Sequence, residues 1–273
     1  MKIFKSIIYL CLLPSILFCQ HSKSFDATKV AAVMVSNISG DIEVTSNNSN
    51  QVLIEYEISN RGSKSYQAHF EMLNDSLYVV VEHDNLYDPG SWDFDKSFPG
   101  NLRPKNCNYN EEPIHIDFKI SMPSNKILKV STINDGDINI SKMDNEIYAY
   151  NINGSIAIKG AREVRRVHTI NGEVDVDFVS NPKKAGKFYT LNGDLNVNLM
   201  KGLDAQFAFN SFNGDFYTNI ENLIILPAKI KTVSDKKKFK IKIGEEKFIQ
   251  VGDGDVALSF ETFNGDAIVK INK

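Results

Sequence analysis

The chain has 273 residues, of which 42% are hydrophobic and 24% charged, with 31 Lys and Arg against 34 Asp and Glu. A formal net charge of −3 excludes the strongly basic surface that is typical of nucleic-acid-binding proteins. The length allows two domains, but all-β chains of this size commonly form one.

The first nineteen residues are predicted to be an export signal. Lys2 and Lys5 give a positive start, and residues 7–18 form an apolar run that is too short to span a bilayer comfortably. We expect cleavage near Cys19, which leaves Gln20 as the first residue. No second apolar run is long enough to cross a membrane, so we expect an exported protein of the periplasm, the cell surface or the outer membrane.

The cysteines leave one alternative open for the N-terminus. Cys19 could instead be acylated as the first residue of a lipoprotein, although Phe18 is larger than the small residue that a lipobox has before its cysteine. An uncleaved membrane anchor is a third possibility. After cleavage at Cys19 only Cys107 remains, so no internal disulfide can form. Residues 1–19 hold two lysines and no acid, so the mature net charge is −5.

Residues 20–125 are predicted to be N-terminal β rungs that continue into the rest of the chain. Apolar and polar residues alternate with a period of two in residues 52–58 and 114–120, which is typical of half-buried strands. No segment has a convincing helical pattern.

The segment 83–113 breaks this pattern with prolines and glycines, and a connection of this length is uncommon inside a compact domain. Three interpretations remain open: a loop that folds back over the core, a loop that contacts a ligand, or a mobile insertion. Its aromatic residues are the candidate ligand contacts, since exposed aromatics suit both sugar stacking and protein hot spots. They are Tyr87, Trp92, Phe94, Phe98 and Tyr109. Trp92, the sole tryptophan, is expected to be at least partly exposed.

Residues 126–273 repeat one short phrase: an apolar residue, Asn, Gly, an acidic or small residue, then an alternating apolar stretch. The copies lie at Asn153-Gly154, Asn171-Gly172, Asn192-Gly193, Asn213-Gly214 and Asn264-Gly265. The glycines at 136, 154, 172, 193 and 214 are spaced by 18, 18, 21 and 21 residues. A fixed period near 20 is typical of a repeat architecture. Because Asn and Gly tolerate positive φ, each Asn-Gly predicts a sharp turn.

These turns can be either hairpin loops or corners of a coil. As a two-residue hairpin loop, Asn171-Gly172 places Ile170 opposite Glu173, on the polar face. At the corner of a coil, both flanking apolar residues can point inward. The pattern therefore favours an all-β solenoid with rungs of about 18–21 residues, and antiparallel stacked hairpins remain the alternative.

The solenoid hypothesis makes two specific expectations. The corner asparagines Asn153, Asn171, Asn192 and Asn213 should occupy equivalent positions on successive rungs. The residues that follow each corner should form one buried column, made of Ile156, Val174, Leu195 and Phe216.

A lysine-rich segment interrupts the repeats at residues 230–249. Its lysines are Lys236, Lys237, Lys238, Lys240 and Lys242, and Phe239, Ile241 and Ile243 alternate with them. This pattern favours an amphipathic edge strand with a solvated lysine face. Contact with an acidic glycan or a lipid headgroup is the alternative.

Four features together resemble the DUF4097 family. They are the export signal, the serial Asn-Gly-Asp phrases, the early copy Ser39-Gly40-Asp41-Ile42-Glu43-Val44 and the strand end Phe118-Lys119-Ile120-Ser121-Met122-Pro123. That family of adhesin-like exported bacterial proteins is often found in Bacteroidetes, and the resemblance covers about residues 30–270. It implies a right-handed single-chain β-helix at the cell surface or in the periplasm, and it brings no catalytic residues. The 83–113 segment and the lysine-rich segment depart from the pattern.

The sequence gives little support for a metal or for catalysis. Asp135, Asp137, Asp253 and Asp255 place oxygens at the turns, but the calcium-binding nonapeptide and EF-hand patterns are missing. Asp194 and Asp215 would be the acid pair of a glycan-processing β-helix enzyme, the alternative function. We therefore expect a non-catalytic scaffold without a cofactor that binds a surface glycan or a protein, and no nucleic acid.

Overall fold

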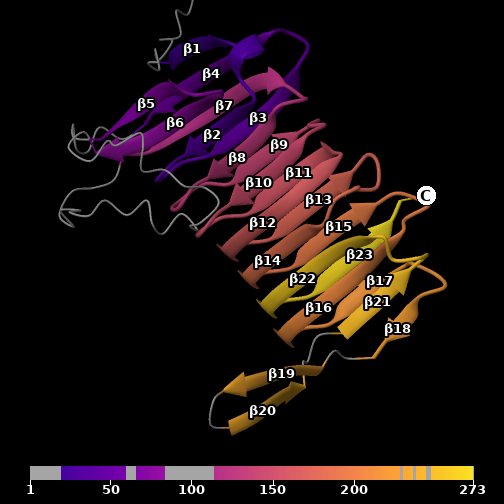
Figure 1. The fold of residues 1–273 in the computed structure, drawn as a ribbon. Coiled ribbons are helices and arrows are strands. Elements are labelled where there is room, and N and C mark those ends of the chain that lie inside the picture. Colours follow the sequence, from indigo (N-terminus) through magenta and orange to yellow (C-terminus); the bar gives the residue numbers. More distant parts are fainter. Residues whose placement is uncertain are drawn as a thin grey trace, which may run out of the picture.

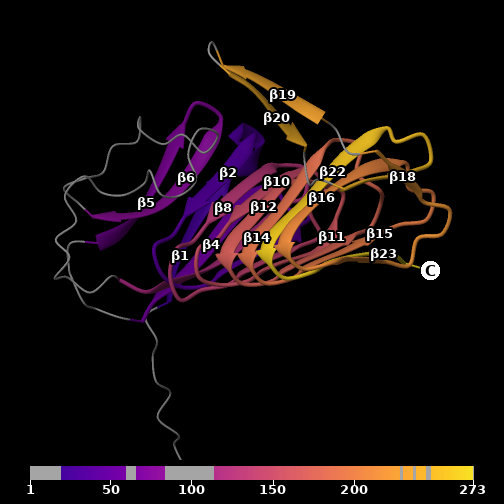
Figure 2. The ribbon, with the colours of Figure 1, turned by 90° about the horizontal axis from the view of Figure 1, so that it is seen from below.

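The computed structural model describes residues 20–59, 66–83, 114–227, 230–235, 238–243 and 247–272. Within these ranges the chain is all-β, as expected, with two large mixed sheets, a separate hairpin and one 3-10 turn at Ala27–Lys29. No helix in the described part of the chain is long and apolar enough to cross a membrane. Figures 1 and 2 show the two sheets stacked face to face along an elongated body.

Sheet A has ten strands. In spatial order they are β1 (Gln20–Asp26), β4 (Gln51–Ile58), β7 (Ile116–Pro123), β3 (Ile42–Asn47), β9 (Ile138–Ser141), β11 (Ile156–Ala161), β13 (Val174–Phe178), β15 (Leu195–Leu199), β23 (Ala267–Ile271) and β17 (Phe216–Thr218). The pairs β1–β4 and β4–β7 are antiparallel, and the pairs from β7 to β17 are parallel.

Sheet B has eleven strands and faces the viewer in Figure 1. In spatial order they are β18 (Ile224–Leu226), β21 (Lys247–Val251), β16 (Ala205–Asn213), β22 (Val256–Asn264), β14 (Gly186–Asn192), β12 (Glu163–Asn171), β10 (Glu146–Tyr150), β8 (Ile127–Ser131), β2 (Ala32–Ser36), β6 (Ser76–His83) and β5 (Tyr66–Leu73). Its central pairs, from β16 to β6, are parallel.

Each Asn-Gly phrase joins a strand of sheet B to the next strand of sheet A. The strands before and after Asn171-Gly172, β12 and β13, lie in different sheets, and each pairs in parallel with strands of neighbouring rungs. Antiparallel hairpins are therefore the wrong interpretation of these repeats. The physical reason is the register argument, since a corner does not place the two flanking strands opposite each other.

The rungs do not stack in the order of the sequence. The C-terminal rung, β22 and β23, lies between the rung of β14 and β15 and the rung of β16 and β17. The expectation that Asn192 and Asn213 close successive rungs is wrong, because Asn264 lies between them. The inserted rung fills the core from both sides: the ring of Phe260 lies 5.2 Å from that of Phe188 and 5.7 Å from that of Phe207.

The expected inner column is present, with one additional member. Ile156, Val174 and Leu195 are fully buried and register with one another. Ala267 follows Leu195, and Phe216 comes after Ala267 as a half-buried residue. Phe216 is more exposed because β17 is the edge strand of sheet A at this end.

The residue before each corner asparagine points outward, contrary to the expectation from the sequence. Thr190 is buried and Leu191 is half-buried, while Phe263 and Phe212 are 44% and 72% exposed. Strand alternation continues up to the asparagine, so the inward position falls two residues before the asparagine and not one.

The lysine-rich segment contributes a hairpin of its own. β19 (Ile230–Asp235) pairs antiparallel with β20 (Lys238–Ile243), and the two form a separate two-stranded sheet. The expected strand is present, and its partner is the other strand of this hairpin; the orientation of the lysine side chains lies outside what the structure describes. Figure 1 shows the hairpin apart from the two large sheets, beyond β16 and β21.

Candidate functional site

The aromatic residues proposed as ligand contacts, Tyr87, Trp92, Phe94, Phe98 and Tyr109, lie outside the described residues, as do Cys19 and Cys107. The structure therefore tests none of them.

The corner asparagines form a ladder of side-chain hydrogen bonds along the body. Asn171 donates from Nδ2 to Oδ1 of Asn153 at 2.9 Å, and Asn192 donates to Asn171 at 2.8 Å. Asn264 donates to Asn192 at 2.8 Å, and Asn213 donates to Asn264 at 2.9 Å. None of these five asparagines has a positive φ. The asparagines were expected at these turns because asparagine tolerates positive φ, but they do not use that property here. Their role is to form the ladder of hydrogen bonds between side-chain amides.

The corner glycines are required because the rungs approach closely. A Cβ on Gly193 would lie 2.2 Å from the carbonyl oxygen of Gly172, and one on Gly265 would lie 1.9 Å from that of Gly193. Gly193 also has a φ of +149°, which side chains of L-residues rarely adopt. Glycine here permits backbone contact between neighbouring rungs.

The aspartate after several of the corner glycines accepts a backbone hydrogen bond from the neighbouring rung. Asp194 accepts a hydrogen bond at Oδ1 from the backbone N–H of Asp266 at 2.8 Å, and Asp266 accepts one from the N–H of Asp215 at 2.8 Å. Asp137 accepts one from the N–H of Ser155 at 2.7 Å. The two acids proposed as a catalytic pair, Asp194 and Asp215, are therefore on rungs separated by the rung of Asp266.

A further element of the corner was missed in the sequence. At four of the five corners, a buried side chain two positions before the asparagine donates a hydrogen bond to the glycine carbonyl of an adjacent rung. Thr190 Oγ1 donates to Gly172 at 2.8 Å, and Thr169 Oγ1 donates to Gly154 at 2.8 Å. The signal was present as a Thr, Ser or Asn two residues before each Asn of the phrase. Polar residues at an inward position must be hydrogen-bonded, and this carbonyl is the partner.

Two of the acids considered as calcium ligands take part in hydrogen bonds within the fold. Asp137 accepts the backbone N–H of Ser155, and Asp255 donates its backbone N–H to Asp204 Oδ1 at 3.0 Å. In the described ranges no group of three or more His, Cys, Asp or Glu side chains could hold a metal ion.

The outer face of sheet B carries rings that are not used in the corners. His168 stacks on Tyr189, with ring centroids 4.2 Å apart and planes at 27°, and lies 6.4 Å from Tyr150. Burial, and secondarily the charge of Arg166, lowers the pKa of His168 from 6.5 to about 4. Burial, and secondarily the charge of Glu261, raises the pKa of Tyr189. Near neutral pH, His168 is therefore a neutral ring and Tyr189 a phenol that can donate a hydrogen bond.

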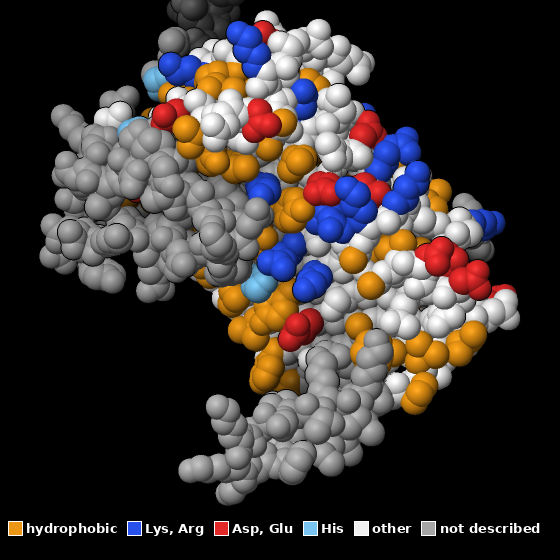
Figure 3. All heavy atoms as spheres, in the orientation of Figure 1, with side chains coloured by type: hydrophobic (Ala, Val, Ile, Leu, Met, Phe, Trp, Pro, Cys, Tyr) orange, Lys and Arg blue, Asp and Glu red, His pale blue; other side chains and the backbone are white. Residues whose placement is uncertain are grey.

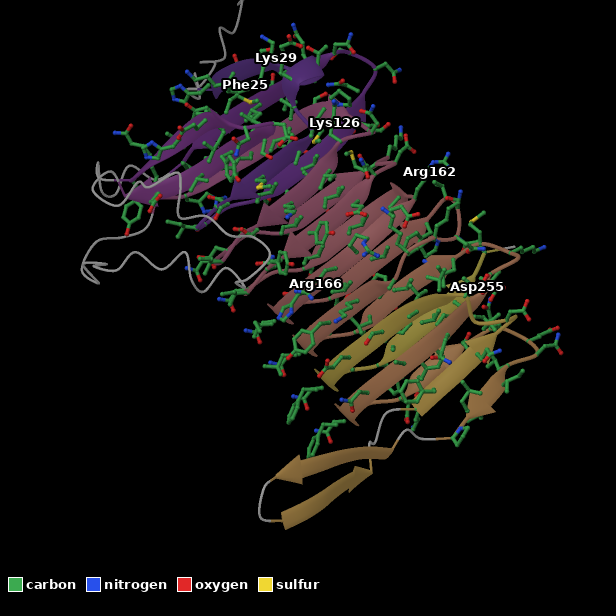
Figure 4. All side chains as sticks on the ribbon, in the orientation of Figure 1. Phe25, Lys29, Lys126, Arg162, Arg166 and Asp255 are labelled. Atoms are coloured by element: carbon green, nitrogen blue, oxygen red, sulfur yellow. The ribbon has the colours of Figure 1, made fainter. Side chains whose placement is uncertain are left out.

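Charged side chains lie beside this ring series on the same face. Glu146 accepts a hydrogen bond from Lys184 Nζ at 2.6 Å and from the Tyr148 hydroxyl at 2.9 Å, and it lies 3.7 Å from Arg165 Nε. The Lys184 hydrogen bond is the main cause that lowers the pKa of Glu146. Figure 4 shows Arg166 on β12, which registers with Lys187 on β14.

The C-terminal part of this face holds a groove of about 260 Å³. Two registered rows cross β14, β22 and β16 here. One row is polar and consists of Tyr189, Glu261 and Asn210, and the other is apolar and consists of Leu191, Phe263 and Phe212. In Figure 3 hydrophobic side chains gather along the edge where these strands end. Leu191, Phe212 and Phe263 stood in the repeated phrases, and strand alternation was the signal that could have placed them outside.

Two other hollows lie nearer the N-terminal end. One, of about 450 Å³, is lined by the polar turns at residues 47–50 and 123–126. The other, of about 240 Å³, is lined by acidic residues of β3, β4 and β7 and by Lys119. Neither combines exposed aromatic rings with hydrogen-bonding groups, so the groove on sheet B is the stronger candidate.

No protein-family model matches the chain, and no curated protein matches it either. Two solved structures are similar to this chain. They are provisionally described as a cell adhesion protein of Clostridium sporogenes ATCC 15579 and an adhesin of Bacteroides fragilis NCTC 9343. The first is 12% identical with a TM-score of 0.48, covering 93% of this chain and 99% of the other; the second is 10% identical with a TM-score of 0.38, covering 93% and 97%. A third, provisionally described as a lipid-binding protein of Parabacteroides distasonis ATCC 8503, is 11% identical with a TM-score of 0.30, covering 91% and 96%.

Proposed function

We propose that this chain is an exported, non-catalytic scaffold of the cell surface or periplasm that binds a glycan or a protein through the outer face of sheet B. In this proposal the two sheets form a right-handed single-chain β-solenoid of the DUF4097 adhesin type. The resemblance of the repeated phrases supports that family, and the passage of each rung from sheet B to sheet A supports the coil.

One observation carries the binding proposal: the outer face of sheet B exposes aromatic rings beside polar side chains that make no hydrogen bond within the described part of the chain. Phe212 is 72% exposed and Phe263 is 44% exposed, next to Glu261 and Asn210. Large exposed apolar groups rimmed by polar residues are typical of interaction sites. The corner Asn, Asp and Thr side chains, in contrast, already make hydrogen bonds between rungs, so they have few free donors or acceptors for a ligand.

The non-catalytic part of the proposal is supported by the surroundings of the acids. Asp194 accepts a backbone N–H of the next rung, and the rung of Asp266 separates it from Asp215. A glycosidase needs two carboxyl groups at roughly 5–10 Å that flank one bond, with one of them free to donate a proton. A carboxylate that caps a backbone N–H is poorly suited to that proton transfer.

The experiment that tests the binding proposal uses the mature chain, residues 20–273, on a glycan array and against extracted cell-surface polysaccharide, with reducing-end release measured in parallel. We expect retention of a glycan or a surface protein without release of reducing ends. Glycan cleavage that is lost in Asp194→Asn would establish the enzyme alternative and overturn the proposal.

Export is tested separately at the N-terminus. Mass spectrometry of the protein from its host should show a first residue near Gln20. A diacylated Cys19 would identify a lipoprotein, which keeps the surface location but changes the attachment. An intact Met1 in a protein recovered from the cytoplasm would overturn the exported scaffold.

A further inference from the structure

The pair Phe212 and Phe263 is an exposed aromatic platform. The two rings are parallel within 5°, with centroids 4.8 Å apart, and they come from the adjacent strands β16 and β22. Their equivalents in the preceding rungs, Ile170 and Leu191, are aliphatic and half-buried. Only at these two rungs of the described Asn-Gly series does the outward position carry an aromatic ring. Because the two rings stack face to face, each covers part of one face of the other, and Phe212 has the larger area open to solvent.

A row of hydrogen-bonding groups borders the platform. Tyr189 registers with Glu261, and Glu261 registers with Asn210, each on the outer side of its strand. The row therefore offers a carboxylate acceptor, an amide that both donates and accepts, and a phenol donor.

We propose that this groove binds a neutral sugar unit of a glycan, with the sugar ring lying on the exposed face of Phe212, whose other face stacks on Phe263. A pyranose has a face of C–H groups, which suits the electron-rich face of an aromatic ring, and a rim of hydroxyls, which suits Glu261 and Asn210. This inference rests on the proposed function and names its ligand class.

Charge and size select the ligand within that class. The groove lining includes one carboxylate, Glu261, and no Lys or Arg, so it favours an uncharged sugar over an anionic one. Its volume of about 260 Å³ is below the roughly 300–1,000 Å³ of pockets that enclose drug-sized ligands. One or two sugar units therefore fit, with the rest of a chain outside the groove.

The test uses the mature chain and isothermal titration calorimetry with defined probes. The neutral probes are cellotetraose, xylotetraose, mannotetraose and chitotetraose, and the anionic probe is tetragalacturonate. We expect at least one neutral probe to bind and tetragalacturonate to bind more weakly. Phe212→Ala and Glu261→Gln should each weaken the neutral complex about tenfold, the loss expected for one stacking or hydrogen-bonding contact.

Tyr217→Ala is the matched control, because Tyr217 is 51% exposed but lies on β17 in sheet A. It should leave sugar binding unchanged. Circular dichroism checks that each variant remains folded, and because Phe212 is exposed we expect its removal to leave the fold intact.

Three results would overturn the inference. If a neutral probe binds but Phe212→Ala and Glu261→Gln have no effect, the proposed function survives and this groove is not the site. If no neutral probe binds, or tetragalacturonate binds more tightly, the proposed ligand class is wrong. Binding of another class of glycan on the array would then still support the proposed function. If sedimentation shows a dimer that Phe212→Ala dissociates and no sugar binds, the platform joins two copies of the chain.

Discussion

Asn264 donates a hydrogen bond from Nδ2 to Oδ1 of Asn192 at 2.8 Å, although 72 positions separate the two residues in the sequence. On its other side Asn264 accepts from Asn213 at 2.9 Å. The last rung of the chain is therefore internal to the stack, where it joins the rung of β14 to the rung of β16.

Removing residues 252–273 should separate the rungs on either side. The deleted rung contains Leu258, Phe260, Ala267 and Val269, which are 0–1% exposed. Each large apolar side chain stabilises the fold by about 1.5–3 kcal/mol, so the loss should reach at least about 5 kcal/mol. Thermal unfolding by circular dichroism measures it. Replacing residues 228–246 by a Gly-Ser linker is the control of similar size, and equal melting temperatures for the two deletions would contradict the internal position of the rung.

Gly193→Ala should destabilise the protein by about 3 kcal/mol or more, because the new Cβ would lie 2.2 Å from the carbonyl oxygen of Gly172. Gly202→Ala is the control. Gly202 has a φ of +75° but no atom within 4 Å of an added Cβ, so only the backbone cost of about 1–2 kcal/mol applies. Urea unfolding gives both free energies of unfolding. A cost at Gly193 no larger than that at Gly202 would show that the rungs are not in contact there.

Asn192→Ala should remove two hydrogen bonds of the asparagine ladder, one in which Asn192 donates and one in which it accepts. At about 0.5–1.5 kcal/mol for each hydrogen bond, and toward the low end because Asn192 is exposed, we expect a total loss of about 1–2 kcal/mol. Asn139→Ala, at an exposed position of β9 outside the ladder, should change the free energy of unfolding by less than about 0.5 kcal/mol. Indistinguishable urea midpoints for the two variants would mean that the ladder contributes nothing.

Leu195→Ala should cost about 2–5 kcal/mol, since the side chain is 0% exposed and lies between Val174 and Ala267 in the inner column. Leu53→Ala changes the same side chain at a position that is 38% exposed and should cost less. The melting temperature of each variant decides the comparison, and an unchanged value for Leu195→Ala would rule out the column as a core element.

His168 should make the fold less stable in acid. Its pKa falls from 6.5 to about 4 in the folded protein, so between these pH values the unfolded chain binds more protons. The stability due to neutral His168 is therefore complete above pH 6.5 and is lost as the pH falls toward 4, by about 1–2 kcal/mol after allowance for its partial exposure. His168→Phe keeps a ring against Tyr189 but cannot titrate. Free energies of unfolding measured from pH 7 to 4 should fall further for the wild type, and parallel curves would exclude this role.

Much of the local structure followed from the sequence. The alternation after Asn153, Asn171 and Asn192 predicted strands. The register of Ile170 against Glu173 favoured a coil over hairpins, and the shared position of Ile156, Val174 and Leu195 predicted a buried column. These features depend on residues that are neighbours in the chain, where the period of a strand and the geometry of a corner act directly.

The tertiary structure alone decided which rungs are adjacent. Every rung carries the same corner phrase, so Asn192 is matched equally well by Asn213 or by Asn264, and the sequence has no preference between them. The platform of Phe212 and Phe263 depends on that choice, because the two rings stack only when β22 lies beside β16. The role of the corner asparagine was hidden for the same reason, since its partner is an amide on another rung and not its own backbone.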